Sequence, residues 1–210
     1  MSKGNVERAT QLEELLRRSA SIDEEEWRGA RRSFTARAQS DGLVGVAFED
    51  HETPLGKLRI NATRAGIVRI ALPGEDFDGV LEDLAGKVSP LILRTSNPTI
   101  TRARHELDEY FAGELRTFTL PIDWTLVRAF RRKVLDATAR IPYGETSSYR
   151  GVATVAGSPN AVRAAGSALA RNPLPIIVPC HRVLRSGGAL GQYAGGLDAK
   201  VQLLSLEKAI

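Results

Sequence analysis

The sequence predicts an α+β first domain with a small antiparallel sheet, followed by a mostly helical second domain with a helix-turn-helix unit. Three observations support this fold class. Short apolar runs between turn residues fill residues 41–122, helical spacing dominates residues 123–210, and a charged extension, residues 1–40, precedes both. A chain of 210 residues with 42% hydrophobic residues is long enough to bury a substantial core in one or two domains.

The extension at residues 1–40 combines charge with leucines at helical spacing, Leu12, Leu15 and Leu16. We expect it to be helical in part, and the sequence assigns it no function. It lacks the apolar core of a signal peptide, and no apolar stretch in the chain approaches the ~20 residues of a membrane span. A single free cysteine suits a reducing compartment. We therefore expect an intracellular protein without membrane contact, cytoplasmic and nucleoid-associated in a bacterium or nuclear in a eukaryote.

The first domain follows a strand pattern and then a helix pattern. The strands are expected at residues 43–48, 58–62 and 66–70, with a turn at residues 54–56 and a final strand at residues 116–121. Between them, residues 99–111 carry apolar side chains at helical spacing and end at Gly113. Nothing in this half indicates catalytic chemistry.

The second domain opens with a predicted helix at residues 124–140. Ser147 or Ser148 can cap a short helix that runs to Ala156 and ends at Gly157. Ser158 and Pro159 then provide an N-cap and a first-turn proline for a helix that ends near Ala170. Two short helices joined by a glycine turn suit a helix-turn-helix, although a plain αα-hairpin has the same pattern.

Charge divides the chain unevenly. Residues 1–123 carry 17 Lys and Arg against 21 Asp and Glu, whereas residues 124–210 carry 12 against 4. An excess of cations in one half suits a polyanionic partner, although an ordinary solvated surface also explains it.

The second helix of the helix-turn-helix candidate has small side chains and one long one, Arg163. The small residues are Ala161, Ala164, Ala165, Gly166, Ala168 and Ala170. Small side chains permit tight helix packing in a core, or close approach to a grooved partner. Because Arg163 projects from this helix in a basic domain, we favour DNA as that partner.

The only cysteine of the chain, Cys180, precedes His181 at the end of an apolar run, residues 174–178, that we interpret as a strand. A lone cysteine is often an inert buried residue, but a thiol beside an imidazole supplies the parts of an activated nucleophile. Because neighbours on a strand point to opposite faces, the backbone must bend or a water must relay the proton. Glu207, in a predicted last helix at residues 197–208, is the acid best able to orient the imidazole. Such a relay also suits a hydrolase or a thiol transferase.

Five motifs in the second domain make the chain resemble one family. They are Ile-Pro-Tyr-Gly-Glu-Thr at residues 141–146, Ser148-Tyr149, Arg171-Asn172-Pro173, Pro179-Cys180-His181-Arg182-Val183 and Tyr193-Ala194-Gly195-Gly196-Leu197. With them the chain resembles the O6-alkylguanine-DNA alkyltransferases, also called methylated-DNA–protein-cysteine methyltransferases. The resemblance is strong over residues 124–208, looser over residues 43–121, and does not include residues 1–40.

The resemblance implies direct-reversal DNA repair, in which Cys180 takes the alkyl group of O6-alkylguanine in a single-turnover reaction without metal or cofactor. His181 would accept the thiol proton through a water, Glu207 would hold His181, and Asn172 would brace the turn beneath. Tyr149 would donate to the guanine ring. The implied substrate contacts are the Ala194 N–H, the Cys180 and Val183 carbonyls, the Pro175 and Tyr193 walls, and Lys200 at the rim.

The resemblance also implies that the second short helix enters the minor groove of double-stranded DNA. Arg163 would fill the gap left by the flipped nucleotide. The expected DNA contacts are Arg163, Ala161, Ala164, Gly166, Ser148 and Arg171, and we expect a monomer in solution. Two other classes stay open at this point, a lesion-binding relative without transfer activity and a cysteine hydrolase or transcriptional regulator.

Overall fold

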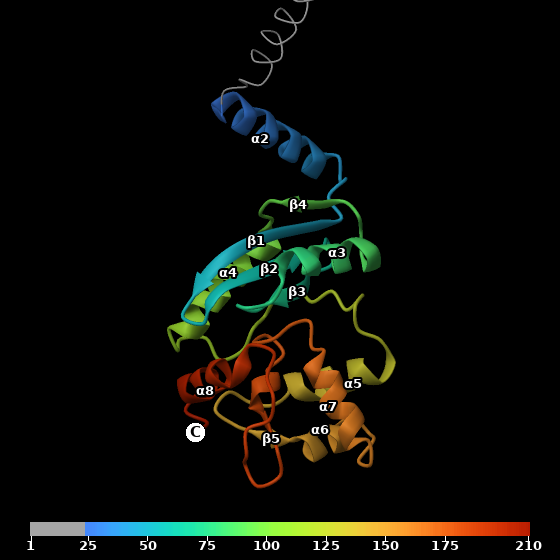
Figure 1. The fold of residues 1–210 in the computed structure, drawn as a ribbon, viewed down its shortest axis with the longest axis vertical. Helices are drawn as coiled ribbons and strands as arrows, with labels where there is room; N and C mark the ends of the chain where they lie inside the picture. The colour runs from blue at the N-terminus through green and yellow to red at the C-terminus, as the bar shows by residue number, and fades with distance from the viewer. Residues whose placement is uncertain (1–23) are drawn as a thin grey trace, which may run out of the picture. The chain divides into compact units, whose positions relative to one another are not determined.

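The computed structural model describes residues 24–210, and Figure 1 shows their elements. The chain divides into two compact units, Met1–Leu43 and Val44–Ile210. In the first unit the described part contains helix α2 (Glu24–Ser40), in agreement with a partly helical extension. The leucine spacing at residues 12–16 lies outside the described residues. Apart from residues 41–43, both predicted domains fall within the second unit, so the boundary between residues 122 and 123 stays a prediction.

A four-stranded sheet in the order β3-β2-β1-β4 forms the first half of the second unit (Figure 1). β1 (Val46–Thr53), β2 (Gly56–Ala62) and β3 (Ile67–Ala71) are antiparallel neighbours. β2 and β3 confirm the strands predicted at residues 58–62 and 66–70, whereas β1 overlaps the strand predicted at residues 43–48 only in part. β4 (Ile92–Arg94), which the sequence pattern did not reveal, pairs with β1 in parallel. The sheet is therefore mixed and not purely antiparallel.

Helix α4 (Pro98–Phe111) packs on one face of the sheet and confirms the predicted helix of this half. It begins where the Asn97 side chain accepts a hydrogen bond from the Ile100 N–H at 2.8 Å. Its apolar stripe, which includes Ala103 and Leu107, is fully buried. The amphipathic pattern was sufficient here because a single face of the helix meets the core.

Helix α3 (Phe77–Lys87) covers the opposite face, and the sequence analysis missed it. Its Leu84 packs against Val46 of β1, whereas the next strand residue, Ala47, belongs to the core on the α4 side. Leu84 is the one fully buried residue of α3. The sequence does carry apolar residues at helical spacing here, Val80, Leu81 and Leu84, which pack on the same cluster, so the missed helix had a readable signal.

The strand predicted at residues 116–121 was wrong. This segment is irregular, and only Ile122 forms an isolated bridge, to Ile67 of β3. The Thr119 N–H and hydroxyl donate instead to the buried Glu106 carboxylate, at 2.8 and 2.6 Å. A side chain thus satisfies the backbone where a neighbouring strand was expected.

Four α-helices dominate residues 124–210: α5 (Ala129–Ala139), α6 (Tyr149–Val155), α7 (Val162–Ala170) and α8 (Gly196–Leu206). Figure 1 shows them as a layer beside the sheet half of the same unit. Within the described residues, no helix is both long and apolar enough to cross a lipid bilayer.

Helix α5 begins later than predicted, because residues 124–128 form a turn. The Asp123 side chain accepts hydrogen bonds from the N–H and the hydroxyl of Thr125, at 2.9 and 2.6 Å. The Val127 N–H donates to the Trp124 carbonyl at 2.8 Å. These bonds stabilise a turn in place of the first helical turn.

Helices α6 and α7 form the predicted helix-turn-helix unit. The Ser148 hydroxyl caps α6 by accepting from the Gly151 N–H at 3.0 Å, and Gly157 ends the helix with a φ of 78°. The predicted start of α7 was wrong, because the Ala161 N–H donates to the Ser158 carbonyl at 2.9 Å in a separate turn. The helix starts at Val162, after this turn.

Candidate functional site

The segment before Cys180 is a buried turn and not the predicted strand. The Val178 N–H donates to the Leu174 carbonyl at 2.8 Å. The Asn172 side chain spans the turn, since its Oδ1 accepts from the Leu174 N–H at 3.0 Å and its Nδ2 donates to the Val178 carbonyl at 2.9 Å. Burial of this turn explains the apolar run at residues 174–178.

Cys180 begins a short 3₁₀ helix, η1 (Cys180–Arg182). Successive side chains in a 3₁₀ helix are about 120° apart, so adjacent residues reach different surroundings. Cys180 is half-buried at a cavity, while His181 is fully buried. The Asn172 Nδ2 also lies 3.3 Å from the Cys180 Sγ. The expected bend at the cysteine is confirmed, in the form of this 3₁₀ turn.

Glu207, the C-cap residue of α8, is the centre of a buried charged cluster. The His181 Nε2 lies 2.9 Å from its Oε1, and the Tyr110 hydroxyl donates to the same oxygen at 2.6 Å. Arg182 donates from Nε to Oε2 at 2.7 Å and from Nη2 to Oε1 at 2.8 Å. Both carboxylate oxygens are therefore satisfied, as a buried carboxylate requires.

Two members of this cluster, Arg182 and Tyr110, were missed by sequence reasoning. Arg182 lies directly after His181, and a second basic residue beside a proposed Glu–His pair was a signal that went unused. Tyr110 is 97 positions from Glu207 and comes from α4 in the sheet half. No sequence pattern could place these two together.

Burial and hydrogen bonding set the charge states of this pair. Burial by itself raises the pKa of Glu207, but hydrogen bonds from His181, Arg182 and Tyr110 outweigh it and lower this pKa to about 2. Burial lowers the pKa of His181, although Glu207 opposes that effect. A neutral imidazole then donates its Nε2–H to the carboxylate. Its Nδ1, which has no protein partner, is left as a proton acceptor.

The thiol is protonated at rest. Burial raises the pKa of Cys180, against the opposing hydrogen bond from Asn172 and the positive charge of Lys200. A thiolate is the reactive form, so a base must take the proton when the sulfur attacks. The acceptor nitrogen of His181, on the adjacent residue, is the group that can do so.

A cavity of about 950 Å³ opens in front of Cys180. It brings together eight of the residues predicted for the site: Cys180, Asn172, Tyr149, Pro175, Tyr193, Ala194, Arg163 and Gly166. They come from α6, α7, the buried turn, η1 and the loop before α8. A nucleophile, a planar aromatic side chain and a long cation thus surround a space of the size that holds a small-molecule ring.

The sequence analysis also missed Gly191, which leaves room for the Tyr149 side chain at this cavity. A Cβ built at Gly191 would lie 2.3 Å from the Tyr149 hydroxyl oxygen, too close for any side chain. A larger residue at position 191 would therefore displace the Tyr149 side chain.

The prediction that Lys200 lies at the pocket rim was wrong. Lys200 is completely buried, and its Nζ donates to the Val183 carbonyl at 2.7 Å. On α8, Leu197 and Val201 are exposed, while Lys200 and Leu203 are buried. Val183 is buried too and lies outside the cavity lining.

The remaining predicted DNA-binding residues lie on or near the helix-turn-helix. Ser148 caps α6, Ala161 is the N-cap residue of α7, Ala164 is exposed on α7, and Arg171 is exposed just after its end. Other small residues of α7, Ala165 and Ala168, are buried. The small-residue pattern therefore reflects both proposed causes, core packing on one side and an open surface on the other.

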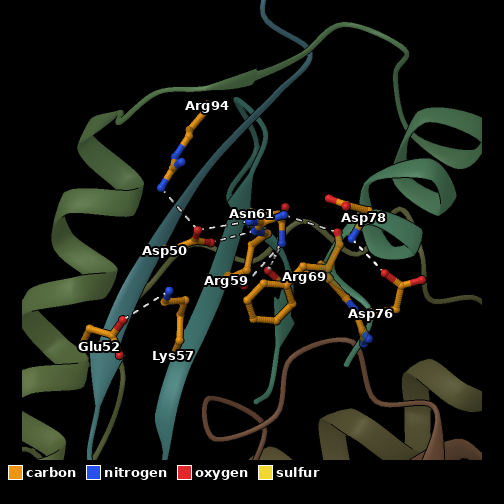
Figure 2. Close-up of polar contacts among 10 residues, drawn as sticks. Asp50, Glu52, Lys57, Arg59, Asn61, Arg69, Asp76, Asp78 and Arg94 are labelled. Carbon is orange, nitrogen blue, oxygen red and sulfur yellow. Dashed lines mark hydrogen bonds and ion pairs between the residues drawn. The ribbon is translucent and has the colours of Figure 1, made fainter. Parts of the chain in front are cut away.

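The face of the sheet on which α3 lies carries a second polar cluster, shown in Figure 2, which contains no nucleophile. Asp50 pairs with Arg59 at 2.7 Å and with Arg94 at 3.4 Å. Glu52 pairs with Lys57 at 3.6 Å. Each of these cations is ion-paired, so the cluster stabilises the sheet half and offers no site. Among residues 24–210, no three His, Cys, Asp or Glu side chains gather as metal ligands do.

Comparisons with known proteins agree with this geometry. Residues 46–124 match the family described as 6-O-methylguanine DNA methyltransferase, ribonuclease-like domain, and residues 129–209 match its DNA binding domain. The constitutive methylated-DNA–protein-cysteine methyltransferase of Bacillus subtilis is 43% identical over 158 residues, which cover 75% of this chain and 92% of the relative. A Mycobacterium leprae protein of the same name is 48% identical over 112 residues, which cover 53% of this chain and 67% of that protein.

Solved structures give the same result. The crystal structure of Mycobacterium tuberculosis O6-methylguanine methyltransferase aligns with a TM-score of 0.66 and 33% identity, covering 78% of this chain and 93% of that one. A structure of M. tuberculosis OGT in complex with DNA aligns with a TM-score of 0.65, 33% identity and the same coverage.

Proposed function

The chain belongs to the 6-O-methylguanine DNA methyltransferase family, and on that premise we propose that it repairs alkylated DNA by direct reversal. It takes the alkyl group of O6-alkylguanine onto Cys180 and is a methylated-DNA–protein-cysteine methyltransferase. One observation carries this assignment. The only cysteine of the chain lies at a cavity beside the helix-turn-helix, with a buried His–Glu pair directly behind it.

The reaction is a displacement at carbon. The Cys180 thiol loses its proton to the His181 Nδ1 through a water, and Glu207 stabilises the imidazolium through its bond to Nε2. The sulfur attacks the alkyl carbon while the carbon–O6 bond breaks, and the electron pair stays with the guanine. Tyr149 donates a hydrogen bond to the ring as negative charge develops. The product is a thioether, which nothing in the site can cleave, so each molecule acts once.

The cavity holds the flipped base. Pro175 and Tyr193 form its apolar walls, and the Ala194 N–H faces the O6 atom. The carbonyls of Cys180 and Val183 accept from the exocyclic amine of guanine. The Val183 carbonyl already accepts from Lys200, but a carbonyl has two lone pairs and can accept twice.

DNA binds to the exposed face of α7, which lies beside the cavity. We place this helix in the minor groove, where Arg163 fills the gap left by the flipped nucleotide. Extrusion of a base costs a few kcal/mol, which the arginine offsets by replacing the lost stacking. Ala164 and Gly166 allow close contact with the backbone, and Ser148 and Arg171 flank them. We expect the protein to act as a monomer, at the nucleoid of a bacterium or in a nucleus.

The intact mass of the protein after incubation with an O6-methylguanine duplex tests this function. We expect one methyl group per molecule, on the peptide that contains Cys180. Cys180→Ser abolishes transfer and keeps DNA affinity within a few-fold, because the thiol is needed for chemistry and not for phosphate contact. Methylation of Cys180→Ser, or many product equivalents per molecule, would contradict the proposal. Binding by the native protein without any transfer would indicate a lesion-binding protein instead.

A further inference from the structure

A second cavity, of about 820 Å³, lies where α3 of the sheet half faces α5 and the end of α7. One wall belongs to α3 and carries Asp76, Asp83 and Lys87. The opposite wall carries three arginines, Arg128 and Arg131 around the start of α5 and Arg171 after α7. We call this hollow the arginine cavity.

The three arginines have no carboxylate partner among the described residues. Arg131 donates one hydrogen bond, to the Leu126 carbonyl at 3.4 Å, and Arg171 donates one to the Ser167 carbonyl at 3.2 Å. Each guanidinium has five N–H donors, so most of them remain available. Arginine with free donors suits phosphate oxygens, which it binds in a bidentate manner.

The acids of the arginine cavity do not cancel these cations. Glu75 pairs with Arg69, and Asp83 pairs with Lys87. Asp76 caps α3 by accepting from the Asp78 N–H at 3.2 Å. After these pairings, the wall formed by α5 and the end of α7 keeps a surplus of positive charge.

The arginine cavity continues the proposed DNA surface. Arg163, Ser167, Ala170 and Arg171 are all exposed, and they lie within about 100° of one another around the axis of α7. Ala170 lines both cavities. Arg171 follows Arg163 by eight residues, a distance of about 12 Å along the helix axis. About three or four base pairs span the same length of a DNA duplex.

We propose that the arginine cavity binds the sugar–phosphate backbone of the repaired duplex, three or four base pairs from the flipped nucleotide. Arg128, Arg131 and Arg171 contact phosphate oxygens there and fix the position of the duplex on α7. This inference rests on the proposed function and adds a second contact to it. Because phosphates are present in every sequence, the contact raises affinity without selecting bases.

The experiment compares the native protein with the triple variant Arg128→Gln, Arg131→Gln, Arg171→Gln. Affinity is measured for a duplex of about 20 base pairs with a central O6-methylguanine, from about 50 to 200 mM salt. Each phosphate contact contributes about 0.9 to the slope of log affinity against log salt. We expect the triple variant to lower the magnitude of this slope by about two to three and to bind at least about tenfold more weakly at low salt.

Lys87→Gln is the matched control, because Lys87 lines the same cavity but is paired with Asp83. We expect its slope to equal that of the native protein. Two shortened duplexes, each with only about two base pairs left on one side of the lesion, show on which side the contact lies. The affinity difference between native protein and triple variant should vanish when the side that reaches the cavity is removed.

An unchanged slope in the triple variant, an equal loss in Lys87→Gln, or a difference that survives truncation on either side would overturn the inference. Mass measurement of methyl transfer by the native protein on the same duplex separates the two proposals. Transfer with an unchanged slope defeats only the phosphate contact. Absence of transfer defeats the proposed function whatever the slope.

Discussion

The sheet-containing half, residues 44–123, and the helical half, residues 124–210, differ in how their cations are neutralised. In the first, most Lys and Arg side chains are ion-paired: Lys57, Arg59, Arg69, Lys87, Arg94, Arg102 and Arg104. Figure 2 includes Lys57, Arg59, Arg69 and Arg94. In the second, all of which the structure describes, ion pairs hold only Arg132 and Arg182.

The contrast shows that the position of a charge matters more than its number. The paired cations of the sheet half hold strands and helices together and contribute little electrostatic potential outside the protein. The unpaired cations around α5, α6 and α7 remain available to phosphate. Arg182 is the informative exception, because it is buried and ion-paired, and its partner is the Glu207 carboxylate that holds His181. Two substitutions test this division and a third tests how the sheet half supports Glu207, in order of decreasing effect.

Arg182→Gln should have the largest effect on stability. It leaves the buried Glu207 carboxylate without its cation, and we expect a loss of about 3 to 5 kcal/mol in the free energy of unfolding. Urea denaturation of both proteins measures this loss. Lys133→Gln, an exposed cation without an ion pair, should change stability by less than about 0.5 kcal/mol. Equal effects of the two substitutions would show that the division between paired and free cations is mistaken.

Arg163→Ala should slow transfer from duplex DNA without changing the stability of the protein. Loss of the side chain that replaces the flipped base should raise the barrier on duplex DNA by about 2 kcal/mol, or about thirtyfold in transfer rate. Transfer to the free alkylated base needs no extrusion and reports the effect on chemistry alone. Arg140→Ala, also exposed and unpaired but outside the cavity, is the control. Equal losses on duplex and free base would contradict the role of Arg163.

Tyr110→Phe should show that the sheet half supports the buried Glu207 carboxylate. The hydroxyl donates to ionised Glu207, so its removal should cost about 1.5 kcal/mol of stability near pH 7. The pKa of Glu207 in the folded protein is depressed to about 2, so the ionised carboxylate contributes its full stability above the pKa of the unfolded state. This stability is lost as the pH falls through the folded pKa. The cost of Tyr110→Phe should therefore shrink when unfolding is measured near pH 3.

Tyr143→Phe provides the matched comparison for Tyr110→Phe. Its hydroxyl donates to the backbone carbonyl of Leu206 at 3.0 Å, next to Glu207 but not to its carboxylate. A carbonyl does not titrate, so the cost of this substitution should be the same at both pH values. The same pH dependence in both variants would mean that Tyr110 acts only through packing.

Sequence reasoning succeeded where a single local signal decides structure. The apolar stripe of α4, the Ser148 cap and the glycine at the end of α6 are all local, and each produced the expected element. It failed where a partner from elsewhere in the chain replaces that signal. Glu106 took the hydrogen bonds of a predicted strand, and Asn172 converted an apolar run into a turn.

The sequence by itself determined the chemistry of this protein, because a lone cysteine beside a histidine, set among five ordered motifs, specifies a nucleophile and its family. It also determined that the helical half is basic. Only the tertiary structure decided which cations remain unpaired, that Lys200 is buried, and that Tyr110 and Arg182 hold Glu207. The physical reason is that charge and motif are properties of residues, whereas burial and pairing depend on contacts between distant segments.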